Sequence, residues 1–334
     1  MKAEDIDRAL TDFYPAIRTA AKAAAEAGRV AQWSDRGAKT KAGEGHRSIV
    51  TAGDHGAEKI LVEKILRDFP QSKILSEEDA DNPNMLKKDD PAGLFEAPLA
   101  FIIDPIDGTA PYGSFLGTWC VSAGVMVNGN LFGGAVYAPD LNGGMLVVAQ
   151  DGLGGNIYDG PQSEMWQRRN WLEPLEDKDN QSTDPKKATV FFGVDSMLYK
   201  SMTDLMPTIA ANVRVTGIAN SGILALAQVA CGRITAVVQT PQKAWDWAGA
   251  YRAVLETGRI FSFFRLVPDT ENPGADKLVE VGENKYDFKA FKYEKVNRLG
   301  YVAGEPEMVR RLMALLPRKG WARTNPENVS GAWK

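Results

Sequence analysis

Residues 104–109, with the sequence DPIDGT, combine two carboxylates with a sharp change of chain direction. The apolar run PLAFII comes directly before them and predicts a buried strand that delivers Asp104 to the edge of a sheet. Pro105 should interrupt the strand ladder and bend the chain, so that Asp107 and the carbonyl of Ile106 converge with Asp104 on one point. Because oxygen atoms are the ligands that Mg²⁺ prefers, the segment predicts a metal site.

The two residues after Asp107 are suited to binding an anion and a water molecule. Gly108 and Thr109 add little bulk, so their backbone N–H groups can approach a phosphate. The hydroxyl of Thr109 can both donate and accept a hydrogen bond, and it could orient a water. An ordinary Asp-Gly turn is the alternative interpretation, but it does not explain the whole hexapeptide.

Two other segments carry acids in unusual surroundings. Residues 76–79, SEED, follow a short apolar run, and three adjacent acids repel one another unless a cation or solvent relieves them. Alone, such a run is typical of a solvated turn. Asp246 stands between two tryptophans at an expected helix start, where an acid also serves as a cap. Glu77 and Asp246, together with Asp104 and Asp107, give four carboxylates. Four carboxylates are enough to bind a pair of divalent ions that clamp a phosphoryl group.

The elements that must position these acids follow from the apolar periodicity. We expect helices over 4–28 and from an N-cap at Asp54 to about Asp68. A short strand in KILSEEDA should run into the acidic turn. The remaining strands of this half should form an antiparallel meander with turns at Asn128-Gly129-Asn130 and Asn142-Gly143-Gly144; they cover 117–128, 131–138 and 144–150.

The second half is also predicted to contain strands and helices. Polar residues over 160–187 and 268–295 indicate surface excursions. A helix capped by Asn220 or Ser221 should cover NSGILALAQVACG. The other expected elements are strands at ATVFFGV, RITAVVQT and 298–303, and helices at 198–211, AWDWAGAYRAVLETG and 306–316. Because strands and helices occur in blocks, they predict layers of sheets and helices. We expect an N-terminal half over 1–150 and a C-terminal half over 151–334, forming one catalytic unit with the site between them.

Composition narrows the possible functions. The chain has 334 residues, 44% of them apolar, and a net charge of −4, which argues against nucleic-acid binding. No run approaches the roughly 18 apolar residues of a membrane-spanning helix, so we expect a soluble cytoplasmic protein. Cys120 and Cys231 lie in apolar runs, typical of buried thiols in a reducing compartment. His46 and His55, the only histidines, have no nucleophile motif beside them.

Taken together, the motifs resemble the inositol monophosphatase superfamily of Mg²⁺-dependent, lithium-sensitive phosphatases. The similarity lies in DPIDGT, in SEEDA and in WDWAGA, with weaker matches at VTAGD together with Glu58 and at ANSGILALAQVACGR. Order and spacing agree over about 45–258 and again near 299–317. No Walker A loop occurs in the sequence, which argues against transfer of phosphate from ATP.

The resemblance implies a fold, a cofactor and a set of roles. The fold would be α+β, a layered α-β-α-β-α sandwich, commonly in a homodimer, with two or three Mg²⁺ ions per site. The metal ligands implied are Glu77, Asp104, the Ile106 carbonyl, Asp107 and Asp246, with Asp54 near a weaker third ion. The phosphate would be held by the N–H groups of Gly108 and Thr109. Glu77 and Thr109 would activate the attacking water, without a covalent phosphoenzyme.

The sequence departs from the family pattern around the expected substrate. Inositol-selective members carry a Glu seven residues before the Asp of WD, where it binds substrate hydroxyls, but this chain has Gln239. We therefore place Gln239 and Ser221 among the substrate contacts and expect a small phosphorylated metabolite: an inositol, histidinol or sugar phosphate. The alternatives are a 3′-phosphonucleotide or fructose-bisphosphate phosphatase of the same superfamily, or a non-catalytic protein that binds metal or phosphate.

Overall fold

The computed structural model describes residues 3–41, 48–78, 82–88, 92–159, 167–170, 183–284 and 298–323. Two large β-sheets and three layers of helices form most of this part of the chain. The α-helices are α1 (Ala3–Ala9), α2 (Pro15–Gln32), α3 (Ala52–Asp68), α4 (Gly93–Glu96), α5 (Thr109–Gly113), α6 (Lys200–Ala210), α7 (Gly222–Ala230), α8 (Ala248–Glu256) and α9 (Pro306–Leu315). Short 3₁₀ helices are η2 (Pro185–Lys187), η3 (Val194–Leu198) and η4 (Ala244–Asp246).

The first sheet has the strand order β3-β4-β5-β6-β7-β8-β9, and the second has the order β11-β10-β12-β15-β13-β14. The strands of the first are β3 (Lys73–Ser76), β4 (Leu99–Asp107), β5 (Cys120–Val127), β6 (Asn130–Ala138), β7 (Met145–Gln150), β8 (Gly154–Asp159) and β9 (Gln167–Asn170). Those of the second are β10 (Thr189–Gly193), β11 (Val215–Ala219), β12 (Ala236–Gln242), β13 (Ile260–Pro268), β14 (Asp276–Glu283) and β15 (Leu299–Gly304). A separate small pair joins β1 (Lys39–Thr40) to β2 (Ile49–Val50).

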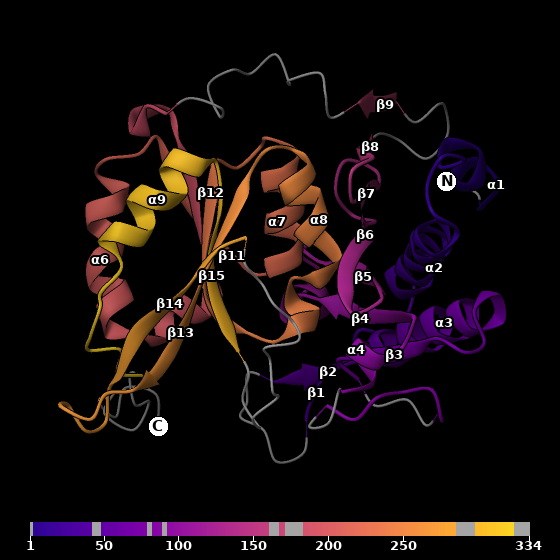
Figure 1. Cartoon of the computed structure of the whole chain (residues 1–334), viewed down its shortest axis with the longest axis horizontal. Coiled ribbons are helices and arrows are strands. Elements are labelled where there is room, and N and C mark those ends of the chain that lie inside the picture. Colours follow the sequence, from indigo (N-terminus) through magenta and orange to yellow (C-terminus); the bar gives the residue numbers. More distant parts are fainter. Residues whose placement is uncertain are drawn as a thin grey trace.

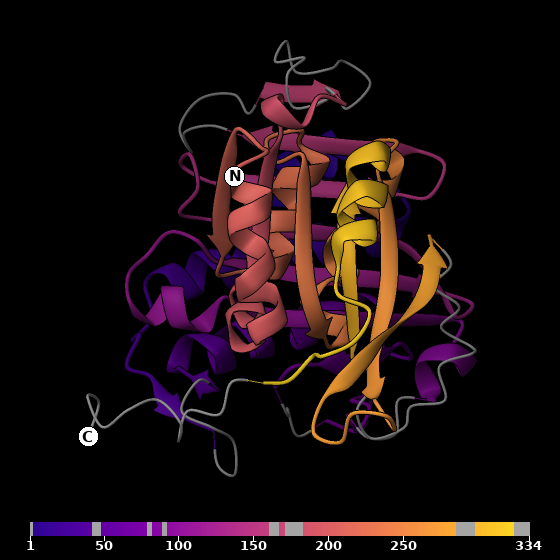
Figure 2. The ribbon, with the colours of Figure 1, turned by 90° about the vertical axis from the view of Figure 1, so that its left-hand side faces the viewer.

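The five layers appear side by side in Figure 1. Helices α2 and α3 cover the outer face of the first sheet, α7 and α8 fill the space between the sheets, and α6 and α9 cover the outer face of the second. Figure 2 shows α6 and α9 in front of the second sheet, whose strands run across those of the first. The expected α-β-α-β-α sandwich is confirmed, and each sheet is buried on both faces by apolar side chains.

The N-terminal helical region differs from the expectation in two places. The prediction of one continuous helix over 4–28 is wrong, because α1 ends at Ala9 and α2 begins at Pro15. The missing N–H and fixed φ of a proline suit the first position of a helix. Asp54 is not an N-cap. Thr51 caps α3, and Asp54 closes a capping box by accepting a hydrogen bond from the Thr51 backbone N–H at 2.7 Å.

The antiparallel meander of β5, β6 and β7 is confirmed. Its turns use Asn128 and Asn142 at φ +48° and +53°, a conformation that asparagine tolerates better than most residues. Pro105 does not end strand β4, which continues to Asp107. The pairing of β4 with β5 shifts its register between Asp104 and Asp107 instead, so the bend expected at the proline is an irregularity inside the ladder.

In the second half, the elements at ATVFFGV, RITAVVQT, 198–211, 298–303 and 306–316 are present as β10, β12, α6, β15 and α9. Strand β11 and the β13–β14 hairpin were missed. β11 has only five residues with a central glycine, and β14 is a polar edge strand, so neither has a strong apolar pattern. β13 does carry an apolar run over 260–264, for which no strand was predicted. Within the described ranges, no helix has both the length and the apolar character needed to cross a membrane. The division near residue 150 stays a prediction.

Candidate active site

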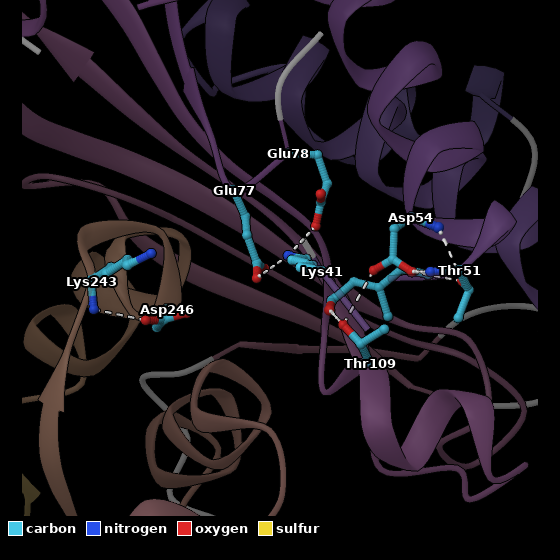
Figure 3. Close-up of polar contacts among 9 residues, drawn as sticks. Lys41, Thr51, Asp54, Glu77, Glu78, Thr109, Lys243 and Asp246 are labelled. Carbon is cyan, nitrogen blue, oxygen red and sulfur yellow. Dashed lines mark hydrogen bonds and ion pairs between the residues drawn. The ribbon is translucent and has the colours of Figure 1, made fainter. Parts of the chain in front are cut away.

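Three acids from separate segments of the chain lie close together. Glu77 follows β3, Asp104 lies in β4 and Asp246 ends η4, and one carboxylate oxygen from each lies within 4.8 Å of the others. Strand β3 runs parallel to β4, and the Glu77 N–H donates to the Ile103 carbonyl at 3.3 Å, which sets Glu77 beside Asp104. In Figure 3 the labelled side chains of Glu77 and Asp246 approach each other from opposite sides.

Asp104 lies in an environment that suits a metal ligand. Its side chain is buried, and neither carboxylate oxygen has a hydrogen-bond partner among the residues that the structure describes. Burial first, and then the charges of Glu77 and Asp107, raise the pKa of Asp104 well above its usual range. An unpaired buried carboxylate is costly, so this position suits a cation. The group of three offers only carboxylate oxygens, which fits Mg²⁺.

Asp246 is anchored by its own turn. Its Oδ2 accepts a hydrogen bond from the backbone N–H of Lys243 at 2.7 Å, which closes η4. Burial, followed by Glu77 and Asp107, raises the pKa of Asp246 well above its usual range. The expected single helix over AWDWAGAYRAVLETG is therefore two helices, and Asp246 belongs to the short first one. The turn aims this acid back across the gap toward β4.

Asp107 is held at the start of α7 and lies outside the close group of three. Its Oδ2 accepts hydrogen bonds from the Ser221 hydroxyl at 2.5 Å and the Ile223 N–H at 2.7 Å. Burial raises the pKa of Asp107 to about 6, although these hydrogen bonds oppose the change. Ser221 is thus the N-cap of α7, because its hydroxyl also accepts from the Leu224 N–H at 3.1 Å. It positions Asp107 rather than facing open space.

Thr109, Asp54 and Thr51 form a chain of hydrogen bonds beside the acids (Figure 3). The Thr109 hydroxyl lies 3.2 Å from Oδ1 of Asp54 and 3.1 Å from the Ile106 carbonyl oxygen. Oδ2 of Asp54 accepts from the Thr51 N–H at 2.7 Å and from the Thr51 hydroxyl at 2.6 Å. Burial raises the pKa of Asp54 to about 6, against the effect of the Thr51 hydrogen bonds. The Ile106 carbonyl expected as a ligand therefore faces Thr109.

Gly108 connects strand β4 to helix α5, and its position requires glycine. Its φ is +90°, and a Cβ atom there would lie 3.0 Å from the Thr118 carbonyl oxygen and 3.1 Å from the Ser221 Cβ. The backbone can therefore pass close to Ser221 and to the Thr118 carbonyl. The N–H groups of Gly108 and Thr109 remain predicted phosphate donors.

Lys41 belongs to the site, although the sequence motifs did not predict it. Its Nζ lies 3.0 Å from Oε1 of Glu77 and 2.5 Å from Oε1 of Glu78 (Figure 3). Burial acts to lower the pKa of Lys41, but Glu77 and Glu78 outweigh it and raise that pKa. No motif surrounds Lys41, and a single lysine in a polar stretch carries no signal. The structure shows that an ammonium group already neutralises part of the acidic cluster.

Replacing Lys41 with Met should strengthen Mg²⁺ binding about three- to tenfold, because Glu77 would lose a competing cation worth about 1 kcal/mol. The melting temperature in chelator should fall, since the buried Glu78 would lose its partner. A calorimetric Mg²⁺ titration and thermal unfolding measure both changes. Lys59→Met is the control, because Lys59 pairs with Glu63 on an exposed helix face at 3.9 Å. Unchanged or weaker Mg²⁺ binding by Lys41→Met would contradict the competition.

Gln239, the expected substrate contact, lies in β12 outside the group of three acids. It is buried, and its Oε1 has no hydrogen-bond partner among the described residues. Cys120 and Cys231 are buried and form no disulfide, as expected. His55 lies within α3, whereas His46 falls outside the described residues. The structure therefore brings together Glu77, Asp104 and Asp246, links Asp54 to Thr109, and holds Asp107 at α7.

The chain is similar to a family of known proteins. The model of the inositol monophosphatase family matches residues 10–272. The chain belongs to the inositol monophosphatase family. A relative named inositol-1-monophosphatase, from Synechocystis, is 29% identical over 244 residues, covering 72% of this chain and 73% of that one. The Nus factor SuhB of Escherichia coli K12 is 26% identical over 258 residues, covering 75% and 86%.

Solved structures of the family share the fold. A Thermotoga maritima IMPase superimposes with a TM-score of 0.62 at 20% identity, covering 89% of this chain and 94% of that one. The extragenic suppressor protein SuhB of Bartonella henselae gives a TM-score of 0.63 at 19% identity, covering 90% and 97%. At this level of identity the likeness concerns the fold alone, and the chemistry of this member of the inositol monophosphatase family must be argued from its own residues.

Proposed function

We propose that this chain hydrolyses small phosphate monoesters with Mg²⁺ bound by Glu77, Asp104 and Asp246. The observation that carries the proposal is the buried Asp104 carboxylate without hydrogen-bond partners, within 4.8 Å of the oxygens of the other two acids. Membership of the inositol monophosphatase family supports it. Asp107 and the Ile106 carbonyl complete the proposed ligand set, for two or three ions in all.

When bound, Mg²⁺ offsets the charge of the acids, polarises the phosphate and lowers the pKa of a coordinated water. The protein contributes position. We place the phosphate at the start of α5, where the N–H groups of Gly108 and Thr109 can donate to its oxygens. Thr109 and Glu77 would orient the attacking water. Because Asp54 is held by two hydrogen bonds from Thr51, it fixes the direction of the Thr109 hydroxyl.

The substrate is proposed to be a phosphorylated metabolite with an uncharged, hydrogen-bonding alcohol part. Gln239 is a neutral amide, and it cannot form the charge-assisted hydrogen bonds to hydroxyls that Glu makes. We therefore expect inositol 1-phosphate to be a poorer substrate than another sugar or polyol monophosphate. Relatives at 27–29% identity carry the names inositol-1-monophosphatase and fructose-1,6-bisphosphatase/inositol-1-monophosphatase, which agrees with this substrate class.

Phosphate release from a panel of monoesters tests the function. We expect turnover with Mg²⁺, none with excess chelator, and full recovery when Mg²⁺ is restored, because the acids repel one another without a cation. A Glu256→Gln variant is a suitable control, since Glu256 accepts hydrogen bonds from Gly152 and Gly154 at 3.1 and 3.0 Å and lies outside the acidic group. Full activity in excess chelator would rule out the metal mechanism.

The proposal also includes a cytoplasmic homodimer. The homodimer is supported by the resemblance of the motifs to the family. The cytoplasmic location is supported by the two buried cysteines outside disulfides, which are typical of a reducing compartment. Sedimentation velocity at micromolar concentration would measure the oligomeric state directly. A monomer that hydrolyses monoesters would overturn the dimer and leave the catalytic proposal intact.

A further inference from the structure

Arg36 contacts the C-terminal end of helix α5, the helix that begins at Thr109. Its guanidinium carbon lies 4.6 Å from the ring centre of Tyr112, 4.8 Å from that of Phe115 and 5.8 Å from that of Trp119. Each distance falls within the roughly 6 Å over which an aromatic face attracts a cation. The Arg36 side chain is 9% exposed, so these contacts form largely out of water, where they are strongest.

The guanidinium of Arg36 also has polar partners. It donates to the backbone carbonyls of Tyr112 at 3.3 Å and Gln32 at 3.0 Å, and it pairs with Asp140 at 3.7 Å. Asp140 accepts in turn from Trp119 Nε1 and Gln32 Nε2, each at 2.7 Å. Because Gln32 is the last residue of α2, Arg36 fastens the end of α5 to the end of α2.

Phe115 has a conformation that costs free energy and contributes little apolar burial. Its φ is +59°, which is unfavourable for a bulky residue, and its side chain is 76% exposed. The feature that this conformation does provide is the aromatic contact with Arg36. Backbone strain persists only where the surroundings impose it, and it is frequent at functional sites. The strained residue therefore indicates that holding Arg36 in place matters for function.

Tyr112 joins this end of α5 to the active site. It is fully buried, and its hydroxyl donates to the Ala31 carbonyl at 2.7 Å. The same hydroxyl lies so close to Gly53 that a Cβ atom there would overlap it. Gly53 directly precedes Asp54 in α3. Tyr112 therefore fixes α5, which begins at Thr109, against the helix that carries Asp54.

The contact between Thr109 and Asp54 is sensitive to the position of α5. The Thr109 hydroxyl lies 3.2 Å from Oδ1 of Asp54, already long for a hydrogen bond between two oxygens (Figure 3). A further shift of about 1 Å would break it. A helix of five residues is not stable by itself, so α5 depends on its neighbours for its position.

We propose that Arg36 is a positioning residue for the hydrolysis of phosphate monoesters. Through Tyr112 it holds α5 in place, and it so keeps the Thr109 hydroxyl directed toward Asp54. Because a misplacement of about 1 Å can cost about 10²-fold in rate, a contact remote from the chemistry can control it. The inference rests on the proposed function and adds a residue that acts at the opposite end of α5 from the proposed phosphate position.

Replacing Arg36 with Met removes the charge and the hydrogen bonds but keeps an unbranched side chain. We expect kcat to fall by about 5- to 50-fold, with KM and Mg²⁺ affinity within about twofold of the wild type, because only the group that orients the water is displaced. Arg36→Lys should recover part of the loss, since lysine keeps a charge beside the rings. Steady-state kinetics and Mg²⁺ calorimetry measure these changes.

A double-mutant cycle with Thr109→Ala tests the route of the effect. If Arg36 acts through Thr109, adding Arg36→Met to Thr109→Ala should lower kcat by less than about twofold further, because the hydroxyl to be positioned is already gone. A residue that only stabilises the fold would cause the same fold-loss of kcat in both backgrounds. The cycle therefore separates positioning from stability even when both single variants melt at lower temperature.

Arg252 is the matched control. Its Nε donates to the Leu131 carbonyl at 2.6 Å, its Nη1 pairs with Asp151 at 2.8 Å, and its guanidinium carbon lies 5.9 Å from the ring centre of Tyr251. The kinds of contact match those of Arg36, but none of these partners belongs to the group of three acids. Arg252→Met should lower the melting temperature and leave kcat within about twofold of the wild type.

The outcomes are distinct. A kcat within twofold of the wild type in Arg36→Met would overturn the inference, and so would an equal loss of kcat with and without Thr109→Ala. Tighter Mg²⁺ binding by Arg36→Met with unchanged kcat would show an effect on Lys41 instead and would also overturn it. A wild-type kcat in Thr109→Ala would overturn the inference and leave the proposed phosphatase standing. Failure of the wild type to hydrolyse any monoester would overturn the phosphatase itself.

Discussion

Replacing Asp104 with Asn should lower kcat/KM for phosphate monoesters by at least about 10³-fold, since loss of a proposed metal ligand removes several kcal/mol of transition-state stabilisation. The same change should stabilise the metal-free protein. Both Asp104 oxygens are buried without hydrogen bonds, and Glu77 and Asp107 add repulsion that a neutral amide would relieve. Mg²⁺ calorimetry, steady-state kinetics and thermal unfolding in chelator measure the three effects.

The stabilisation should depend on pH in a defined direction. The pKa of Asp104 in the folded protein is raised well above the unfolded value of about 4. Its favourable contribution is therefore complete below about pH 4 and is lost as the pH rises through the folded-state pKa. In chelator, the melting temperature of Asp104→Asn should exceed that of the wild type increasingly from pH 5 to pH 8. Added Mg²⁺ should reverse the order, because only the wild type binds it fully.

Asp68→Asn provides a control of opposite sign. Burial acts to raise the pKa of Asp68, but hydrogen bonds from Thr19 and Arg67 outweigh it and lower that pKa. The Asp68→Asn protein should therefore be slightly less stable than the wild type at neutral pH. Its Mg²⁺ binding should be unchanged. An Asp104→Asn protein that retains wild-type activity, or that is less stable than the wild type in chelator at pH 8, would contradict the role of Asp104.

Replacing Thr109 with Ala should lower kcat by roughly 10- to 1000-fold with KM and Mg²⁺ affinity little changed. The hydroxyl links Asp54 to the proposed water, and acid–base assistance of this kind is worth about 10²–10⁴ in rate. The backbone N–H remains, so phosphate contact should persist. A change in kcat alone is the pattern of an interaction made mainly in the transition state.

The structure also offers a purely local role for Thr109. Its hydroxyl lies 3.1 Å from the Ile106 carbonyl oxygen, a contact that could do no more than stabilise the turn. In that case Thr109→Ala would lower the melting temperature and leave kcat near the wild-type value. Thr257→Ala is the matched control, because the Thr257 hydroxyl bonds only the backbone carbonyls of Ala253 and Val254 at 3.2 and 2.8 Å. It should affect stability alone.

Local patterns in the sequence were sufficient to predict the acidic segment around Asp104 and most of the helices and strands. The buried strand before Asp104, the Asn-Gly turns of the meander and the small-residue helix after Ser221 all depend on periodicity or on backbone conformations that few residues adopt. The choice of carboxylates as ligands likewise follows from residue type. Each of these features depends on a few residues that are adjacent in the sequence, so the sequence is sufficient to predict it.

Only the tertiary structure decided which of the acids lie together and which residues surround them. Asp107 is drawn to the start of α7 by Ser221, 114 residues away in the chain, while Asp104 remains with Glu77 and Asp246. Lys41 reaches Glu77 across 36 residues, and Tyr301 meets Gln239 only because β12 and β15 pair in one register. Such contacts depend on the packing of whole layers, which fixes distances between segments that have no periodic or spacing relation in the sequence.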